Sequence, residues 1–273
     1  MNTKWSDDLC EYYKVDEETA LELGTRSSGR KPNLPGSSTC EPVSEMTYED
    51  IWAIRERNDT ESVFQFYRDQ GAWATFRQCV RHKDMVHYHM NVLSSLFGIC
   101  KMREAFHICE YGCGVAPFMN TLLNFLKPES SKLRISISDV KDCEHFKFAE
   151  WRLDRKIKDK NLDVDLNPKP ITHNSLPKYD DKLDLVLVFE VLEHVPSPIS
   201  IIKNIHDQLN DGGIVVENFI KHDDDDHHAD DSDLDSAAEE REGFYKFLND
   251  NFHRVMGNSP EESPNETRAW RKK

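Results

Sequence analysis

The sequence predicts a doubly wound α/β fold with a mostly parallel sheet, preceded by a helical extension at the N-terminus. Two observations predict this fold class. From about residue 105 onwards, apolar segments of strand length alternate with segments whose apolar residues follow a helical period. In addition, glycine or acidic residues directly follow three of the expected strands, where a parallel sheet gathers its ligand-binding groups.

The first expected strand runs into a glycine turn. The segment His107–Met119 reads as a buried strand, an acidic residue, the turn Gly112-Cys113-Gly114 and a helix start. Glycine lets the backbone approach a ligand closely, and a helix N-terminus offers unpaired N–H groups, so the segment predicts a nucleotide-sized pocket. Pro117 occupies the third glycine position of the dinucleotide fingerprint, which disfavours NAD.

Two further strands end in polar residues. Leu133, Ile135 and Ile137 alternate along a strand that ends at Asp139, whose carboxylate can accept hydrogen bonds from two ribose hydroxyls or can cap a turn. We expect a third strand near residues 169–172, with His173 directly after it.

The fourth expected strand is a near-continuous apolar run, Leu183–Phe189, as expected for a parallel strand buried on both faces. It continues into Glu190–Pro196, with the sequence EVLEHVP. After a helix, the turn Asn210–Gly213 leads into the fifth strand. A helix over Ala237–Asn251 and two short strands, 252–256 and 267–270, complete the expected order.

These motifs resemble those of class I S-adenosylmethionine (SAM)-dependent methyltransferases. Glu110, Gly112 and Gly114 match the acidic-x-G-x-G-x-G motif, with Ala116 at its third glycine, and Glu190–Pro196 resembles the segment after the fourth strand. The resemblance implies a seven-stranded sheet with a closing antiparallel hairpin, SAM as cofactor and S-adenosylhomocysteine as product. It also implies a set of cofactor-binding residues, namely Glu110, Gly112, Cys113, Gly114, Asp139, Val140, His173, Asn174, Glu190 and Val191.

The resemblance implies roles for these groups. Glu110 and the turn after it are expected to position the methionine part of SAM, Asp139 to hold its ribose, and His173 with Asn174 to contact its adenine. His194 is the first candidate for a catalytic group beside the methyl acceptor, and His228 is the second.

The acceptor is not written in the sequence. The segment after the fourth strand lacks an N-P-P-Y or D-P-P-Y motif, and its form resembles small-molecule O-, N- or C-methyltransferases. An RNA or protein methyltransferase is the alternative, which a basic groove of Arg77, Arg81, Lys83, Lys101 and Arg103 would favour. A non-catalytic SAM-binding or scaffold protein is a third possibility, since Ala116 replaces a glycine.

The amino-acid composition limits the kinds of partner and the location that we expect for this protein. The formal net charge is −15 at pH 7 and the chain has no strongly basic stripe, which disfavours nucleic acid as a partner. The seven cysteines form no C-x-x-C pair and fit reduced thiols. We find no apolar run of membrane length and no signal peptide, and therefore expect a cytoplasmic protein with no membrane segment. The oligomeric state stays open.

The domain organisation follows from these readings. We expect a partly flexible N-terminal segment (1–46), a helical cap (47–104) and a SAM-binding domain (105–273) with an acidic loop at 222–236. Like charges in sequence repel, so this loop reads as a mobile acidic lid, with metal binding and docking of a cationic acceptor as the alternatives. We assign no metal ligand.

Overall fold

The computed structural model describes residues 5–25, 59–100, 106–128, 132–172, 176–221 and 234–273. The helices of these segments are α1 (Asp7–Tyr13), α2 (Glu17–Thr25), α4 (Thr60–His82), α5 (Val86–Ile99), α6 (Pro117–Phe125), α7 (Glu144–Asp159), α8 (Pro198–Gln208) and α9 (Asp235–Asn251), with a 3-10 turn η1 (Leu192–His194). The strands are β1 (Phe106–Tyr111), β2 (Leu133–Ser138), β3 (Val164–Pro168), β4 (Leu183–Val188), β5 (Leu209–Glu217), β6 (Phe252–Met256) and β7 (Arg268–Lys272).

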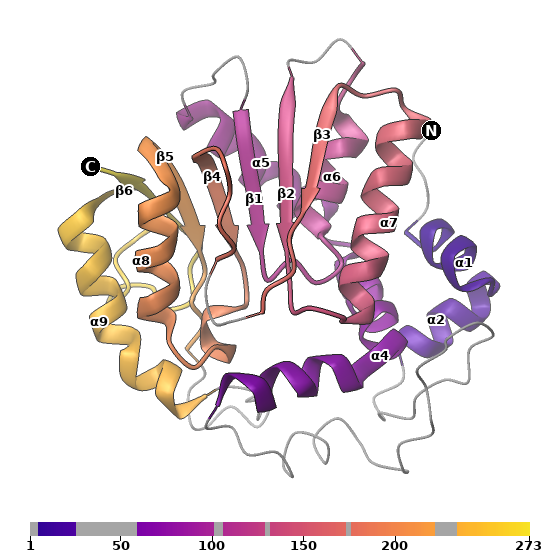
Figure 1. Cartoon of the computed structure of the whole chain (residues 1–273), viewed down its shortest axis with the longest axis horizontal. Helices are drawn as coiled ribbons and strands as arrows, with labels where there is room; N and C mark the ends of the chain where they lie inside the picture. The colour runs from indigo at the N-terminus through magenta and orange to yellow at the C-terminus, as the bar shows by residue number, and fades with distance from the viewer. Residues whose placement is uncertain (1–4, 26–58, 101–105, 129–131, 173–175, 222–233) are drawn as a thin grey trace.

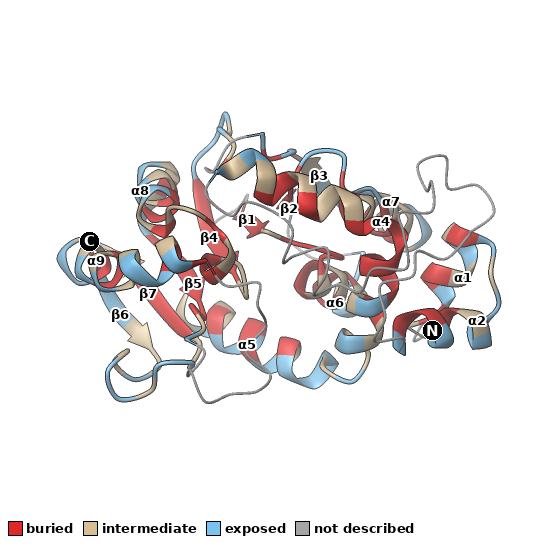
Figure 2. Ribbon diagram, turned by 90° about the horizontal axis from the view of Figure 1, so that it is seen from below, coloured by how far each residue is buried: buried red, intermediate tan, exposed pale blue. Residues whose placement is uncertain are grey.

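The seven strands form one mixed sheet in the order β3-β2-β1-β4-β5-β7-β6. Strands β1 to β5 pair in parallel, whereas β7 is antiparallel to both β5 and β6. Helices cover both faces, and Figure 2 shows the buried strands between α8 and α5. The doubly wound, mostly parallel seven-stranded fold that the sequence predicts is therefore confirmed.

The two central strands are buried because helices cover both sides of the sheet. Every residue of β1 and of β4 is buried. The one charged residue inside β4, Asp184, accepts hydrogen bonds from the backbone N–H of His107 at 2.9 Å and from the side chain of Asn210 at 2.8 Å. Pairing of this kind offsets the cost of burying a carboxylate.

The expected position of the third strand is wrong. The strand is Val164–Pro168 and ends just before residues 169–172, where the sequence predicts it. Because β3 is an edge strand with half-exposed residues, it lacks the apolar run that identifies a buried strand. Ile171 makes only an isolated parallel bridge with Val140, at the end of β2.

Helix α4 lies across the ends of the strands (Figure 1), where their carboxyl termini meet. Asp59 caps its start by accepting a hydrogen bond from the backbone N–H of Ser62 at 2.9 Å. At Gly71 the backbone leaves the helical region, with φ +59° and ψ −146°, so α4 consists of two helical halves joined at a kink.

The N-terminal helices α1 and α2 rest on the second half of α4 and on α7. They share a small apolar cluster that includes Leu9, and in it the ring of Tyr13 packs against those of Phe76 and Phe148. Residues 26–58, which include the second part of the expected N-terminal segment (1–46) and the start of the expected cap, lie outside the described residues. Within the part of the chain that the structure describes, no helix is both long and apolar enough to cross a bilayer.

Candidate functional site

The turn between β1 and α6 contains three residues in the left-handed region. Gly112 has φ +62°, Gly114 has φ +52° and Ala116 has φ +50°. Glycine adopts this region without steric cost, whereas alanine pays roughly 1 kcal/mol. The turn is held in place from β2, because the N–H of Cys113 donates to the carbonyl of Ser138 at 3.0 Å.

Glu110, at the end of β1, turns its carboxyl group toward the start of α6. Its two oxygens accept hydrogen bonds from the backbone N–H groups of Phe118 and Met119 at 3.3 and 3.1 Å. A carboxylate at a helix N-terminus complements the helix dipole. Burial nevertheless dominates and raises the pKa of Glu110 to about 8.

Asp139 follows β2 and is also buried, with an exposed fraction of 6%. Its carboxylate accepts hydrogen bonds from the N–H groups of Gly114 and Val140, each at 2.6 Å, and lies 3.3 Å from Nε2 of His145. Burial alone would raise its pKa, but His145 and these hydrogen bonds hold the pKa below its usual value. Asp139 is therefore a preorganised carboxylate that faces the glycine turn.

The segment after β4 lies on the other side of the turn. Glu190 adopts a left-handed conformation, with φ +53°, and its N–H donates to Oδ1 of Asn218 at 2.7 Å. Its carboxylate forms an ion pair of 2.5 Å with Arg81 of α4. The next residue, Val191, lies so close to the turn that a Cβ on Gly112 would meet its Cγ2 at 2.3 Å.

These strand ends enclose a cavity of about 270 Å³, near the lower end of the usual range for ligand pockets. It is lined by the predicted site residues Glu110, Gly112, Cys113, Gly114, Asp139, Val140, Glu190, Val191 and His194. Three separate segments that the sequence singles out thus meet at one place. His173, Asn174 and His228 lie outside the described residues.

Helix α4 closes the cavity from the side opposite the sheet. The side chain of Gln78 accepts a hydrogen bond from the N–H of Val115 at 3.0 Å, and a Cβ on Gly114 would meet its Oε1 at 2.2 Å. Together with the Arg81–Glu190 ion pair, this contact ties the second half of α4 to the glycine turn and to the end of β4. In this conformation the two glycines make room for Gln78 and Val191.

Several lining residues are not among the site residues that the sequence predicts. They come from α4, α5 and the end of β5, and they include Gln78, His82, Tyr88, His89 and Asn218. His89 is 1% exposed, and its ring lies 4.6 Å from that of Phe118. Burial lowers the pKa of His89 to about 4 and that of His82 to about 3, so both are neutral at pH 7.

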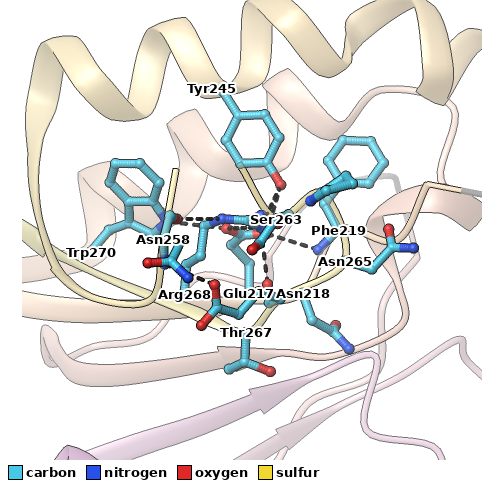
Figure 3. Close-up of polar contacts among 12 residues, drawn as sticks. Glu217, Asn218, Phe219, Tyr245, Asn258, Ser263, Asn265, Thr267, Arg268 and Trp270 are labelled. Atoms are coloured by element: carbon cyan, nitrogen blue, oxygen red, sulfur yellow. Dashed lines mark hydrogen bonds and ion pairs between the residues drawn. The ribbon is translucent and has the colours of Figure 1, made fainter. Parts of the chain in front are cut away.

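A second polar cluster lies behind the site, at the end of β5 (Figure 3). Glu217 is fully buried and accepts hydrogen bonds from Trp270 at 3.1 Å, Tyr245 at 3.2 Å and the N–H of Phe219 at 2.8 Å. The Arg268 guanidinium lies 3.6 Å from it. Since Asn218 directly follows Glu217, this cluster fixes the strand end from which Asn218 reaches Glu190.

Comparison with known proteins identifies the class of protein that this fold and site define. A model of the methyltransferase domain family matches residues 96–258, which is more than half of the chain, so the chain belongs to that family. It is an enzyme of the SAM-dependent methyltransferase class, and SAM is its cofactor. The buried carboxylates, the glycine turn and the aromatic lining of the cavity are groups that fit such a ligand.

Three solved structures with a similar fold illustrate how distant in sequence such matches are. The N-methyltransferase NodS from Bradyrhizobium japonicum WM9 is 17% identical, with 68% of this chain and 94% of that chain covered and a TM-score of 0.46. Small RNA methyltransferase HEN1 is 15% identical over 67% of this chain and 25% of that chain, with a TM-score of 0.48. Coclaurine N-methyltransferase bound to N-methylheliamine and S-adenosylhomocysteine is 14% identical over 62% and 50%, with a TM-score of 0.42. None of the curated protein sequences matches the chain significantly.

Proposed function

We propose that this methyltransferase modifies a small molecule, which binds beside SAM beneath α4. The observation that carries the proposal is the roof of the cavity. Helices α4 and α5 cover the strand ends, and their aromatic side chains Phe64, Tyr67 and Tyr88 line the space. Gln78 and Arg81 connect α4 to the residues below it, and the covered cavity therefore has room for a compact acceptor rather than for a polymer.

In this proposal the cofactor is held by the glycine turn and by the carboxyl groups around it. Asp139 accepts hydrogen bonds from the ribose, Glu190 faces the methionyl part, and Glu110 fixes the start of α6 so that its N–H groups stay aligned. Phe118 and Phe189, whose rings stack at 4.3 Å, supply an apolar wall. SAM, when bound, supplies an electrophilic methyl group.

The remaining task of the chain is to orient the acceptor and exclude water. His194 lines the cavity on the turn η1, close to the acidic side chain of Glu193, with 3.9 Å between Nε2 and Oε1. We assign it the role of proton acceptor for a hydroxyl, amine or carbon acceptor. In this proposal the carboxyl group of Glu193 lies beside the imidazole that receives the proton.

A polymer acceptor has weaker support. Of the five basic residues that would form a groove for RNA, Lys101 and Arg103 lie outside the described residues. Of the other three, Arg77 and Arg81 line the central cavity and Lys83 lines a second one. The net charge of −15 also opposes long-range attraction of a polyanion.

The test has two stages. Calorimetric titration with SAM and S-adenosylhomocysteine, with NADH as control, measures cofactor binding. Transfer of a labelled methyl group from SAM is then compared between a small-metabolite extract, total RNA and total protein. Label in the small-molecule fraction supports the proposal. Label only in RNA or protein overturns it, and tight binding without transfer to any fraction favours a non-catalytic SAM-binding protein.

The variant His194→Gln distinguishes a role of His194 as a base from a role in cofactor binding. We expect it to bind S-adenosylhomocysteine like wild type and to transfer methyl groups ~10²-fold more slowly, as is typical for the loss of a general base. His206→Gln is the matched control, because His206 lies on α8 outside the cavity lining. Unchanged transfer by His194→Gln would remove His194 from catalysis.

A further inference from the structure

A second cavity, of about 200 Å³, lies on the far side of the glycine turn. Residues of α1, α4, α5, α6 and α7 line it, and His82, His89 and Pro117 line both this cavity and the cofactor cavity. The two cavities therefore share a wall without sharing their chemistry. Carboxyl groups, arginines and histidines together line the first cavity, whereas the charged groups of the second are mostly cations.

The deep part of the second cavity contains two buried cations from one face of α7. Arg152 is 5% exposed and Lys156 is 6% exposed. The guanidinium of Arg152 donates from Nη2 to the carbonyl of Val115, while its Nε has no hydrogen-bond partner among the described residues. A buried charged donor without a partner is unfavourable, and an anion beside the guanidinium would offset part of this cost through its charge.

The buried positive charge of Lys156 is only partly compensated by its neighbours. Its Nζ donates to Asn120 and lies 3.5 Å from a carboxylate oxygen of Asp8. Burial lowers its pKa to about 8 although Asp8 acts in the opposite direction. Asp8 also pairs with Arg155 at 2.7 Å, so its charge is divided between two cations.

The residues that line the second cavity have a positive net charge. Lys83, Arg152 and Lys156 are its cations, and Asp8 is the single acidic residue among the described residues that line it. This leaves a net formal charge of about +2 in a recess of a protein whose total is −15. Low-dielectric walls strengthen such a local potential.

The mouth of the cavity is apolar. Phe125 is 54% exposed and Val86 is 36% exposed, and both line the opening together with Trp5. Lys83 lies over the Trp5 ring at 5.7 Å from its centre. Exposed apolar side chains around a concave site are typical of ligand-binding surfaces.

We propose that this second cavity binds a small organic anion, with its acidic group on Arg152 and Lys156 and its aromatic or apolar body against Trp5, Val86 and Phe125. The size of the cavity suits a single ring that bears one carboxylate, sulfonate or phosphate group. The site is independent of the methyl-transfer chemistry, so neither proposal rests on the other.

Benzenesulfonate is a suitable probe because its charge does not change near neutral pH. We expect saturable binding to the full chain at pH 7 by calorimetry, with the same affinity in the presence of saturating S-adenosylhomocysteine. Displacement of the probe by S-adenosylhomocysteine would overturn the proposal, since it would place the probe in the cofactor cavity. Equally, no saturable binding of the probe would overturn it.

Matched variants on one helix locate the binding. Lys156→Met is expected to weaken benzenesulfonate at least tenfold, whereas Lys158→Gln, an exposed lysine of α7 paired with Asp154, leaves the affinity unchanged. Lys83→Gln, at the partly exposed wall, weakens it about threefold and guards against misfolding of the buried variant. Equal affinities in wild type, Lys156→Met and Lys83→Gln would assign the probe to the general surface and refute the site.

Discussion

Two buried glutamates stand at the ends of parallel strands and have different surroundings. Glu217, after β5, is met by Arg268, Trp270, Tyr245 and a backbone N–H (Figure 3). Glu110, after β1, accepts from two backbone N–H groups and lines the cavity. Burial raises the pKa of both, to about 8 for Glu110.

The difference shows what separates a structural carboxyl group from a functional one. Burial and a perturbed pKa occur in both places, so neither identifies the site. Glu217 has a cation and three hydrogen-bond donors around it and does not line the cavity, whereas Glu110 borders space that a ligand can enter. The presence of that space, next to a glycine turn, is what points to function.

The largest expected effect comes from breaking the Glu217 cluster. Glu217→Gln leaves the Arg268 charge buried and poorly compensated, which costs ~3–5 kcal/mol of unfolding free energy. Urea unfolding measures this loss, and Glu239→Gln on the exposed side of α9 is the control. A loss below ~1 kcal/mol would mean that the ion pair does not hold this strand end.

Glu110 provides the second test, through pH. Its folded pKa of about 8 lies above its unfolded value, so its stabilising contribution is complete at low pH and is lost as pH rises through 8. Between about pH 4.5 and 8 the wild type should lose up to ~1.4 kcal/mol per pH unit relative to Glu110→Gln. Parallel stability curves for the two proteins would show that Glu110 is ionised throughout.

Gly112 tests the closeness of the two strand ends. An added Cβ meets Val191 and forces a non-glycine residue to φ +62°, so Gly112→Ala should weaken S-adenosylhomocysteine at least tenfold. The double variant Gly112→Ala with Val191→Ala removes the clash and recovers part of the affinity. Wild-type affinity in Gly112→Ala would contradict the proposed role of the turn in cofactor binding.

His89 gives the smallest effect. Its folded pKa of about 4 lies below the unfolded value, so its contribution is present above pH 6.5 and is lost as pH falls toward 4. The variant His89→Asn keeps an acceptor for Thr121. Between pH 7.5 and 5.5 its free energy of unfolding should fall by ~1 kcal/mol less than that of wild type. Thermal unfolding at pH 7.5 and 5.5 measures the difference, and an equal loss in both proteins would place His89 in contact with solvent.

Local patterns in the sequence predicted much of the fold. The apolar run of β4, the glycine turn after β1 and the final hairpin each carry a local signal. β3 was misplaced because an edge strand has no continuous apolar run. The sequence could predict that the three strand ends lie close together, because parallel strands end at one edge of a sheet.

The roof of the site could not be predicted. Which face of α4 meets the glycine turn depends on the kink at Gly71 and on the packing of α1 and α2 beside it. No pattern in the sequence therefore predicts that Gln78 and Arg81 contact the glycine turn and the end of β4. Asn218 is a further case, since its contact with Glu190 exists only because β4 and β5 are neighbours. The domain boundaries and the cytoplasmic location stay predictions.

Calorimetric titration of S-adenosylhomocysteine into wild type, Asp139→Asn and Asp142→Asn tests most directly whether the cofactor binds in this cavity. The last is the control, because Asp142 is an exposed aspartate three residues along the chain. We predict saturable binding to wild type, a loss of ~1–3 kcal/mol in Asp139→Asn and no change in Asp142→Asn. Equal affinity in all three proteins, or no binding to wild type, would contradict the assignment of this cavity to the cofactor.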